Sequence, residues 1–136
     1  MKKRILFSIF LLLFSCNKEK HNNRLLAGDW EIRNYSEIIF DGTTNKFSLL
    51  SGSAHFDNLN GKAEANFSLT LYAVASSDTI DRNVSGVYSR RAIDTLELKM
   101  NDSIYLFDIN RIFKTDLNLQ GGLDPNRKGI YIMKKK

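Results

Sequence analysis

The sequence predicts an all-β domain, an antiparallel meander of short strands closing into a barrel of about eight strands, preceded by a signal-peptide helix. Apolar and polar residues alternate with period two over residues 63–73, a pattern that excludes an amphipathic helix. Further strand-like stretches recur along the chain with turn residues between them. No secure helical pattern follows the first sixteen residues, and closure into a barrel protects every edge of a meander.

The first fifteen residues have the layout of a secretory signal segment. Three basic residues at positions 2–4 come first, an apolar run covers residues 5–14, and Ser15 supplies a small residue at the end. Extended to Ser15, this run would span roughly 16 Å as a helix, about half of a bilayer core. It is too short for a transmembrane anchor, so we expect cleavage before residue 16.

Cys16, the only cysteine of the chain, follows this segment directly. The stretch Leu13-Phe14-Ser15-Cys16 resembles the lipobox of bacterial lipoproteins. The resemblance implies that Cys16 is acylated and becomes the first residue of the mature protein, which two or three acyl chains anchor durably to a membrane. Asn17 is not the aspartate that retains some lipoproteins in the inner membrane. The resemblance therefore favours the outer membrane and leaves the leaflet open.

The segment after the cysteine is expected to be a tether. Residues 17–24 contain no aliphatic or aromatic side chain, so they cannot bury apolar surface and should be flexible. The expected organisation is a signal peptide over residues 1–15, a lipidated flexible tether over 16–24 and one β domain over 25–136. Cleavage removes three of the 20 basic residues and leaves 17 against 15 acidic ones. This near-balance gives no argument for nucleic-acid binding.

The first strand of the domain is expected over residues 28–40, where Asp41-Gly42 signals a hairpin. Strict alternation places Trp30 on one face of this strand and Tyr35 on the other. Asn60-Gly61 is a strong type I′ turn signal because both residues tolerate positive φ. Further strands are expected over residues 47–50, 54–56, 63–73, 84–89, 95–100, 103–109, 117–119 and 129–133, with a polar loop over 76–83 and a turn at 101–102.

Gly28 and Trp30 form a Gly-x-Trp at the start of the first strand of this all-β domain. The arrangement resembles the lipocalin (calycin) family, and more narrowly the lipocalin-like lipoproteins of Gram-negative bacteria. The resemblance implies that Trp30 plugs the closed end of the barrel and that a late basic residue packs across it. Arg111 and Lys114 are the candidates for that basic residue. With or without this family role, Trp30 is expected to be a core residue and not a ligand contact.

No combination of residues indicates an active site. His55 lies near two serines, but the spacing assembles no Ser–His–Asp arrangement, and P-loop, dinucleotide-binding and His-Glu-x-x-His motifs do not occur. With Cys16 as the lipid site, the domain has neither a thiol nucleophile nor a cysteine-based metal site. The sequence therefore predicts a protein that is not an enzyme and that has no catalytic residue, cofactor or metal.

Two functions remain open from the sequence. In the first, the barrel encloses an apolar cavity that binds a small hydrophobic or amphipathic ligand. The aromatic residues suited to line it, which are otherwise plain core, are Phe47, Phe56, Phe67 and Phe107. In the second, the barrel is filled by its own side chains and docks an envelope protein partner through its outer face. Tyrosines on otherwise polar strand faces favour this second function: Tyr35, Tyr72 and Tyr88.

Overall fold

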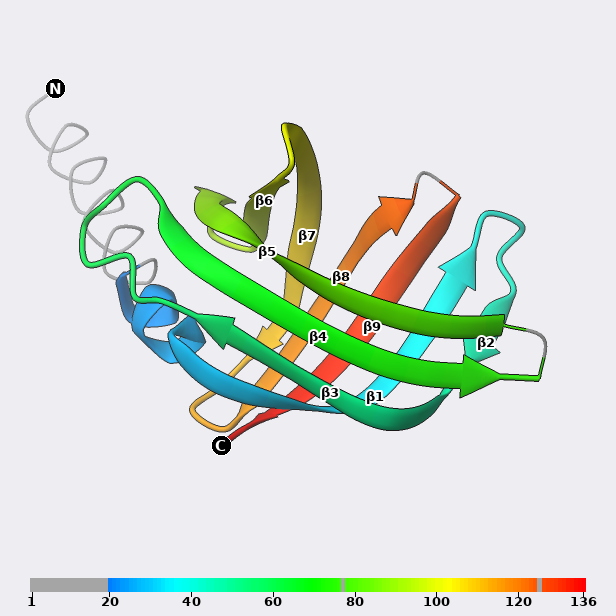
Figure 1. Cartoon of the computed structure of the whole chain (residues 1–136). Helices are drawn as coiled ribbons and strands as arrows, with labels where there is room; N and C mark the ends of the chain where they lie inside the picture. Colours follow the sequence, from blue (N-terminus) through cyan, green and yellow to red (C-terminus); the bar gives the residue numbers. More distant parts are fainter. Residues whose placement is uncertain (1–19, 77, 125) are drawn as a thin grey trace, which may run out of the picture.

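The computed structural model describes residues 20–76, 78–124 and 126–136 (Figure 1). The expectations for the signal segment, for Cys16 and for residues 17–19 lie outside the described residues. The described strands are β1 (Gly28–Ile39), β2 (Thr44–Lys46), β3 (Ser48–Phe56), β4 (Ala65–Ala75), β5 (Asp78–Ala92), β6 (Thr95–Met100), β7 (Ser103–Ile112), β8 (Asp116–Asp124) and β9 (Arg127–Lys135).

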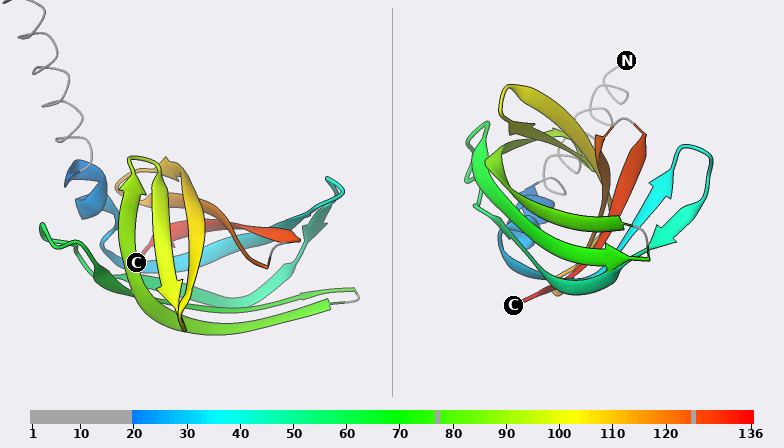
Figure 2. Two further views of the ribbon diagram at one scale, coloured as in Figure 1. Left: turned by 90° about the horizontal axis from the view of Figure 1, so that it is seen from above. Right: turned by 45° about the vertical axis from the view of Figure 1, so that its right-hand side comes forward.

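All of these strands belong to one antiparallel sheet that closes on itself. Each strand from β3 to β8 pairs with the next one in the chain, and β9 returns to pair with β1. β2 and β3 lie beside opposite ends of β1, so together they fill one position in a barrel of eight strands. The views in Figure 2 show the strands curling around a common interior. The predicted meander closed into a barrel of about eight strands is confirmed.

The clearest local predictions hold in the structure. β4 buries every second side chain as its alternation predicts, from Phe67 to Ala73. Asn60 and Gly61 have φ values of 48° and 77°, the positive pair that a type I′ turn requires. Asn101 and Asp102, with φ values of 47° and 64°, make the turn between β6 and β7.

Residues 20–26 are helical, which corrects the expected flexible tether over its described part. Asn22 is buried and Leu26 is completely buried, so one face of the helical segment packs on the end of the barrel. The apolar surface that residues 17–24 lack comes from the residues directly after them, chiefly Leu26. Within the described ranges, no helix is long and apolar enough to span a bilayer.

Trp30 closes the barrel at the end that this helical segment covers. Its side chain is completely buried, and its indole Nε1–H donates to the carbonyl oxygen of Leu26 at 2.8 Å. The Lys135 Nζ lies 4.9 Å from the centre of the indole ring. The same ammonium donates to the carbonyl oxygens of Leu25, at 3.0 Å, and of Ala27. Indole and ammonium therefore fix the C-terminal turn of the helical segment to the barrel.

The basic residue across the tryptophan is thus Lys135, and neither Arg111 nor Lys114 takes that position. Trp30 and Lys135 are direct partners in the β1–β9 ladder, which explains the contact. Arg111 instead places its guanidinium 4.8 Å from the ring centre of Phe113, and Lys114 is exposed. The pairing of the first strand with the last, which no local pattern reveals, decides the choice.

Lys135→Met is expected to lower the free energy of unfolding by about 1–2 kcal/mol, because the carbonyl oxygens of Leu25 and Ala27 lose a charged donor. Urea unfolding of the variant and the parent chain measures the difference. Lys134→Met is the matched control, since Lys134 is exposed and pairs only with Asp116 at the surface in the described contacts. We expect little change there. An equal loss in both variants would contradict the role of Lys135.

Candidate functional site

Tyr35 and Glu37 point into the barrel because β1 contains a β-bulge. The register between β1 and β9 shifts between Ile32 and Asn34. A bulge adds one residue to a strand, so the side chains beyond it change faces. Tyr35 is 1% exposed and Glu37 is 2% exposed. The expectation that Tyr35 lies on the face opposite Trp30 is therefore wrong, and the interior receives a carboxylate.

The buried carboxylate of Glu37 is held by two neighbours. The Tyr35 hydroxyl donates to Glu37 Oε1 at 2.6 Å. The Nη1 of Arg127, on β9, lies 3.5 Å from Glu37 Oε2 and donates to Asp78 Oδ2, on β5, at 2.7 Å. Burial, the nearby Tyr131 and the hydrogen bond to Glu37 all raise the pKa of Tyr35, so its hydroxyl remains a donor at neutral pH.

Arg82 brings a second guanidinium into the interior from the first part of β5. Its Nη1 donates to the hydroxyl oxygen of Tyr131, on β9, at 2.7 Å. Burial alone would lower the pKa of this guanidinium, but the oxygens of Tyr131 and Tyr35 favour the charged form and the pKa is raised. In the described part of the chain, Arg82 is therefore a cation whose recorded partners inside the barrel are the tyrosine hydroxyls.

Aromatic rings surround these polar groups. The ring centre of Tyr35 lies 5.0 Å from that of Tyr131 and 5.4 Å from that of Phe47. Phe107 adds a fourth ring, 6.0 Å from Tyr131. Tilted pairs at such distances are favourable and present ring faces and ring edges to one another. The arrangement combines apolar surface with hydrogen-bonding groups at one level of the barrel.

A pair of glycines makes room for these rings. Gly121 on β8 and Gly129 on β9 are direct partners, and neither carries a side chain. A Cβ atom at Gly129 would lie 2.9 Å from a ring atom of Tyr131 and 3.0 Å from one of Tyr35. A Cβ atom at Gly121 would lie 2.6 Å from a ring atom of Phe107. The rings therefore rest on bare backbone, as glycine within a strand allows.

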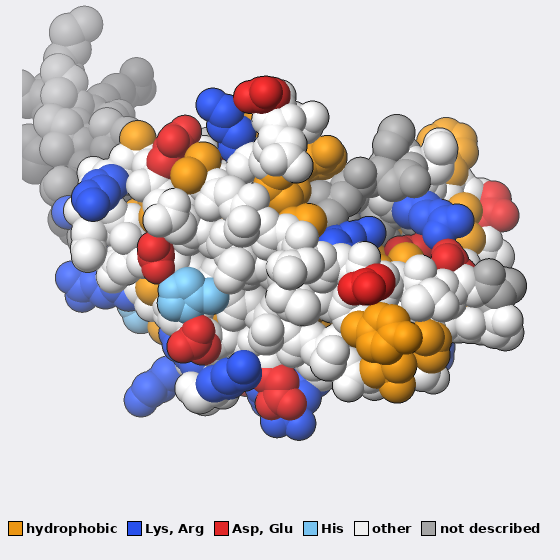
Figure 3. Space-filling view, viewed as in Figure 1, with side chains coloured by type: hydrophobic (Ala, Val, Ile, Leu, Met, Phe, Trp, Pro, Cys, Tyr) orange, Lys and Arg blue, Asp and Glu red, His pale blue; other side chains and the backbone are white. Residues whose placement is uncertain are grey.

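The barrel wall has a window at the level of this cluster. In the described part of the chain, residues 78–86 of β5 pair with β4 alone, because β6 begins its ladder at Val87. β5 then passes in front of β8 and β9 (Figure 1), and Figure 3 shows a hollow there with basic and acidic side chains. The contacts Arg82–Tyr131 and Asp78–Arg127 link β5 to β9 across the window. Side chains thus connect the two strands in place of a backbone ladder.

All four predicted cavity phenylalanines are buried inside the barrel, but they belong to two groups. Phe47 and Phe107 lie in the aromatic cluster at the window. Phe56 stacks on Phe67 with ring centres 6.2 Å apart and meets the edge of Tyr88 at 5.4 Å. This second group packs in the core of the barrel, outside the polar cluster at the window.

Two of the three tyrosines that favoured an outer interaction face are internal. Tyr35 and Tyr88 are completely buried, and only Tyr72 is exposed, by 41%. The Tyr88 hydroxyl donates to the carbonyl oxygen of Asp57, and burial raises its pKa to about 12. Tyr35 and Tyr88 are therefore core residues. Of the three tyrosines, Tyr72 alone still supports an interaction surface on the outer face.

The sequence analysis did not predict the charged members of the site, which are Glu37, Asp78, Arg82 and Arg127. It also did not predict Tyr131, the hydrogen-bond partner of Arg82. One signal was available on β5. Ile80, Val84 and Tyr88 occupy every fourth position of this strand, and Arg82 is in phase with them. Side chains two apart share a face, so this phase places Arg82 inside the barrel.

His55 lies on the outer surface between two carboxylates. Its Nδ1 is 2.7 Å from Asp29 Oδ1 and its Nε2 is 2.8 Å from Asp57 Oδ1. Both hydrogen bonds raise the pKa of the imidazole. Among the described residues, no group of three or more His, Cys, Asp or Glu side chains is placed to hold a metal ion. His55 joins β1 to β3 as a polar clamp.

His55→Gln is expected to destabilise the protein in a pH-dependent way. Because the folded-state pKa lies above the ordinary value of about 6.5, the stabilisation is fully present below that pH and is lost as pH rises through the folded pKa. Urea unfolding of parent and variant at mildly acidic and at alkaline pH measures the difference. A difference that does not depend on pH would contradict the clamp.

Comparisons with known proteins give similarity of structure only. No protein-family model matches the chain, and no curated protein matches its sequence. A redesigned β-barrel is 16% identical, with a TM-score of 0.49 and coverage of 85% of this chain and 95% of the other. A lipocalin-like protein from Bacteroides uniformis is 16% identical, with a TM-score of 0.46 and coverage of 82% and 98%. A deswapped triple mutant of bovine odorant binding protein is 16% identical, with a TM-score of 0.47 and coverage of 82% and 74%.

Proposed function

We propose that this protein is a lipid-anchored binding protein of the cell envelope whose barrel holds a small amphipathic ligand behind the window. The observation that carries the proposal is the Arg82–Tyr131 contact, a charged guanidinium inside the barrel beside an aromatic cluster. Arg82 is half-buried, and withdrawing a charge from water even in part is costly, so its retention in a small domain favours a role in recognition. The tyrosine and phenylalanine rings supply the matching apolar surface.

The proposed binding mode follows from this geometry. The polar group of the ligand accepts hydrogen bonds from Arg82, and its apolar part lies against the rings of Tyr35, Phe47 and Phe107. The ligand enters by separating Arg82 from Tyr131 and Asp78 from Arg127, which breaks no backbone ladder. Trp30 fills the other end of the barrel, so the ligand remains near the window.

The test is native mass spectrometry after exposure to an envelope extract from the host. The protein used is the chain from residue 16 onward, carrying Cys16→Ser so that no acyl group is attached. We expect a discrete bound mass that is lost on denaturation. Arg82→Gln is expected to lower the bound fraction at least tenfold, because a charged hydrogen bond is lost.

Arg91→Gln is the matched control, because Arg91 is exposed and pairs with Glu97 on the outer surface. Its bound fraction should equal that of the parent chain. A clean apo mass with repeated extracts, or equal occupancy in both variants, would overturn binding at Arg82.

The anchor is a separate part of the proposal. Cys16→Ala is expected to leave an unprocessed precursor without acyl groups, because the thiol is the acceptor that the lipobox resemblance implies. Intact mass and incorporation of labelled palmitate in the host measure processing and acylation. Acylation of the Cys16→Ala protein would show that the lipobox interpretation is wrong.

An outer apolar patch favours a second function, in which a filled barrel docks an envelope protein. Leu50 is 59% exposed and Tyr72 is 41% exposed, and Tyr72 pairs with Ser51, the residue after Leu50. Figure 3 shows apolar side chains gathered over β3 and β4 near the β4–β5 hairpin. A photo-crosslinker at position 72 in the host envelope would capture such a partner, whereas the same group at Asn66, elsewhere on the outer face of β4, would not.

A further inference from the structure

A groove lies at the helix end of the barrel, remote from the Arg82 window. It has a volume of about 560 Å³ and lies between the helical segment and the loop from β3 to β4. Four of its lining residues are basic, namely Lys20, Arg24, Lys62 and Arg90, and no acidic residue lines it in the described part of the chain. The groove is therefore a strongly positive concave surface.

Three separate segments bring these cations together. Lys20 and Arg24 are four residues apart on the helical segment, and residues at this spacing share a face. Lys62 follows the type I′ turn at Asn60-Gly61, and buried Leu59 fixes this loop to the barrel. Arg90 comes from β5, where its Nε donates to Asn23 Oδ1 at 2.5 Å. The fold, and not chain proximity alone, makes the groove.

The charge and size of the groove fit a phosphate ester. Lysine and arginine bind phosphate oxygens through charge-assisted hydrogen bonds, and arginine does so with two parallel donors. Three of the cations, Lys20, Arg24 and Lys62, are exposed and can reach a ligand from opposite walls. A volume of this order accommodates a polar headgroup.

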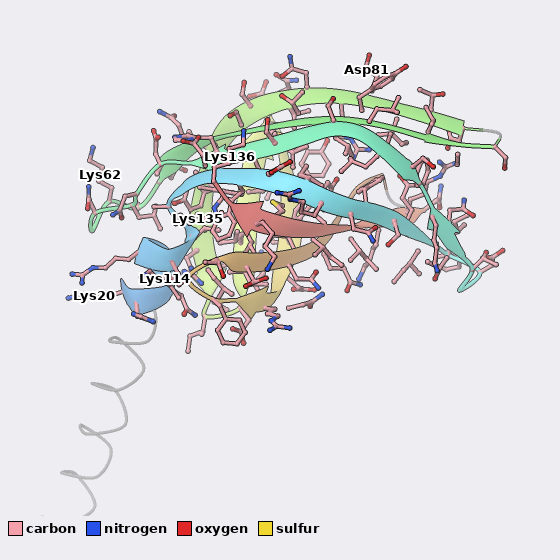
Figure 4. All side chains as sticks on the ribbon, turned by 90° about the horizontal axis from the view of Figure 1, so that it is seen from below. Lys20, Lys62, Asp81, Lys114, Lys135 and Lys136 are labelled. Atoms are coloured by element: carbon pink, nitrogen blue, oxygen red, sulfur yellow. The ribbon has the colours of Figure 1, made fainter. Side chains whose placement is uncertain are left out.

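The position of the groove favours a lipid headgroup over a free anion. Cys16 is four residues before Lys20, and four residues span at most about 14 Å. If Cys16 is acylated, a point that rests on the proposed function, the groove lies at the headgroup level of the membrane. Figure 4 shows Lys114, Lys135 and Lys136 on the same side as Lys20 and Lys62, whereas Asp81, the residue before Arg82 on β5, lies well away from them.

We propose that this groove binds the phosphate-bearing headgroup of an anionic membrane lipid. Binding there holds the helix end of the barrel against the bilayer and turns the Arg82 window away from it. The contact adds an electrostatic attachment to the acyl anchor and fixes the orientation of the domain, which acyl chains on a short segment do not.

Sedimentation with lipid vesicles tests this proposal on the chain from residue 16 onward with Cys16→Ser. We expect binding to phosphatidylcholine vesicles that contain about one third phosphatidylglycerol, at a low salt concentration of about 0.05 M, and none to pure phosphatidylcholine. Lys20→Gln, Arg24→Gln and Lys62→Gln together should lower the partition coefficient roughly 100-fold, at about fivefold for each cation.

The matched control removes the same charge elsewhere. Lys46, Lys99 and Lys128 are exposed on β2, β6 and β9, and their combined change to glutamine should lower partitioning only slightly. Thermal unfolding confirms that both triple variants are folded. Equal losses in the two variants, no binding to the anionic vesicles, or equal binding to neutral vesicles would overturn the proposal.

Inorganic phosphate separates the two sources of the anion. If calorimetric titration shows that inorganic phosphate binds the protein while anionic vesicles do not sediment it, the groove is a site for free phosphate and the lipid assignment is wrong. Because this experiment needs neither acylation nor a ligand behind the window, its outcome is independent of the tests of Cys16 and Arg82.

Discussion

Replacing Trp30 by alanine is expected to lower the free energy of unfolding by about 3–5 kcal/mol. The indole is completely buried, donates to Leu26 and carries the Lys135 ammonium on its face. Its removal leaves a cavity at the closed end and releases the helical segment at once. Urea unfolding followed by far-ultraviolet circular dichroism measures the change, since Trp30 is the only tryptophan and fluorescence would be lost.

Two further variants make this prediction specific. Phe113→Ala removes an aromatic residue that is 54% exposed, and its effect should stay below about 1 kcal/mol. Trp30→Phe keeps most of the packing but loses the hydrogen bond to Leu26, so an intermediate loss is expected. If Trp30→Ala costs no more than Phe113→Ala, the tryptophan does not plug the barrel.

Gly121→Ala is expected to destabilise the protein by about 1–3 kcal/mol, although it adds one methyl group to a strand. The new Cβ atom would collide with the ring of Phe107 and lie 2.7 Å from the carbonyl oxygen of Leu106. The ring must therefore move, and it carries with it the packing on Tyr131 beside Arg82. Urea unfolding measures the stability, and native mass spectrometry measures ligand occupancy in the same variant.

A double-mutant cycle with Phe107→Leu tests the cause. The smaller side chain leaves space for the new methyl group, so Gly121→Ala should cost less in the Phe107→Leu background than in the parent chain. The contact with the Leu106 carbonyl remains in both backgrounds, and part of the cost remains with it. Equal costs in the two backgrounds would show that the ring is not the obstacle.

Local signals predicted the parts of the fold that depend on neighbouring residues. The turn at Asn60-Gly61 and the alternation of β4 each involve residues a few positions apart, and the structure has both. The closed barrel also followed, because a meander of short strands without helices has few other ways to protect its edges. These features need no knowledge of distant contacts.

Features that depend on distant contacts were missed. The bulge in β1 is set by pairing with β9, and it reverses the expected direction of Tyr35. Lys135 reaches Trp30 through the same pairing. No pattern in the sequence indicates this pairing, so Arg111 and Lys114 were the candidates instead. The helical segment over residues 20–26 forms because the barrel offers it a surface for Leu26.

The sequence predicted the apolar part of the site but not its charged part. The phenylalanines were expected inside the barrel because large apolar side chains on predicted strands favour the interior. The charged members break that rule, since Asp78 and Arg82 face inward at the start of β5 and made residues 76–83 resemble a loop. Polar residues on an interior face are where a function departs from the pattern that folding alone favours.

The ladder between β1 and β9 also has a kinetic consequence. Every other ladder joins strands that are close in the chain, whereas this one joins the first strand to the last. Pairing between distant segments is slow, and β1 lacks its partner until β9 has been synthesised. A growing chain can therefore form the successive hairpins before it can seal the barrel. That delay suits the export to the membrane that we propose for this protein.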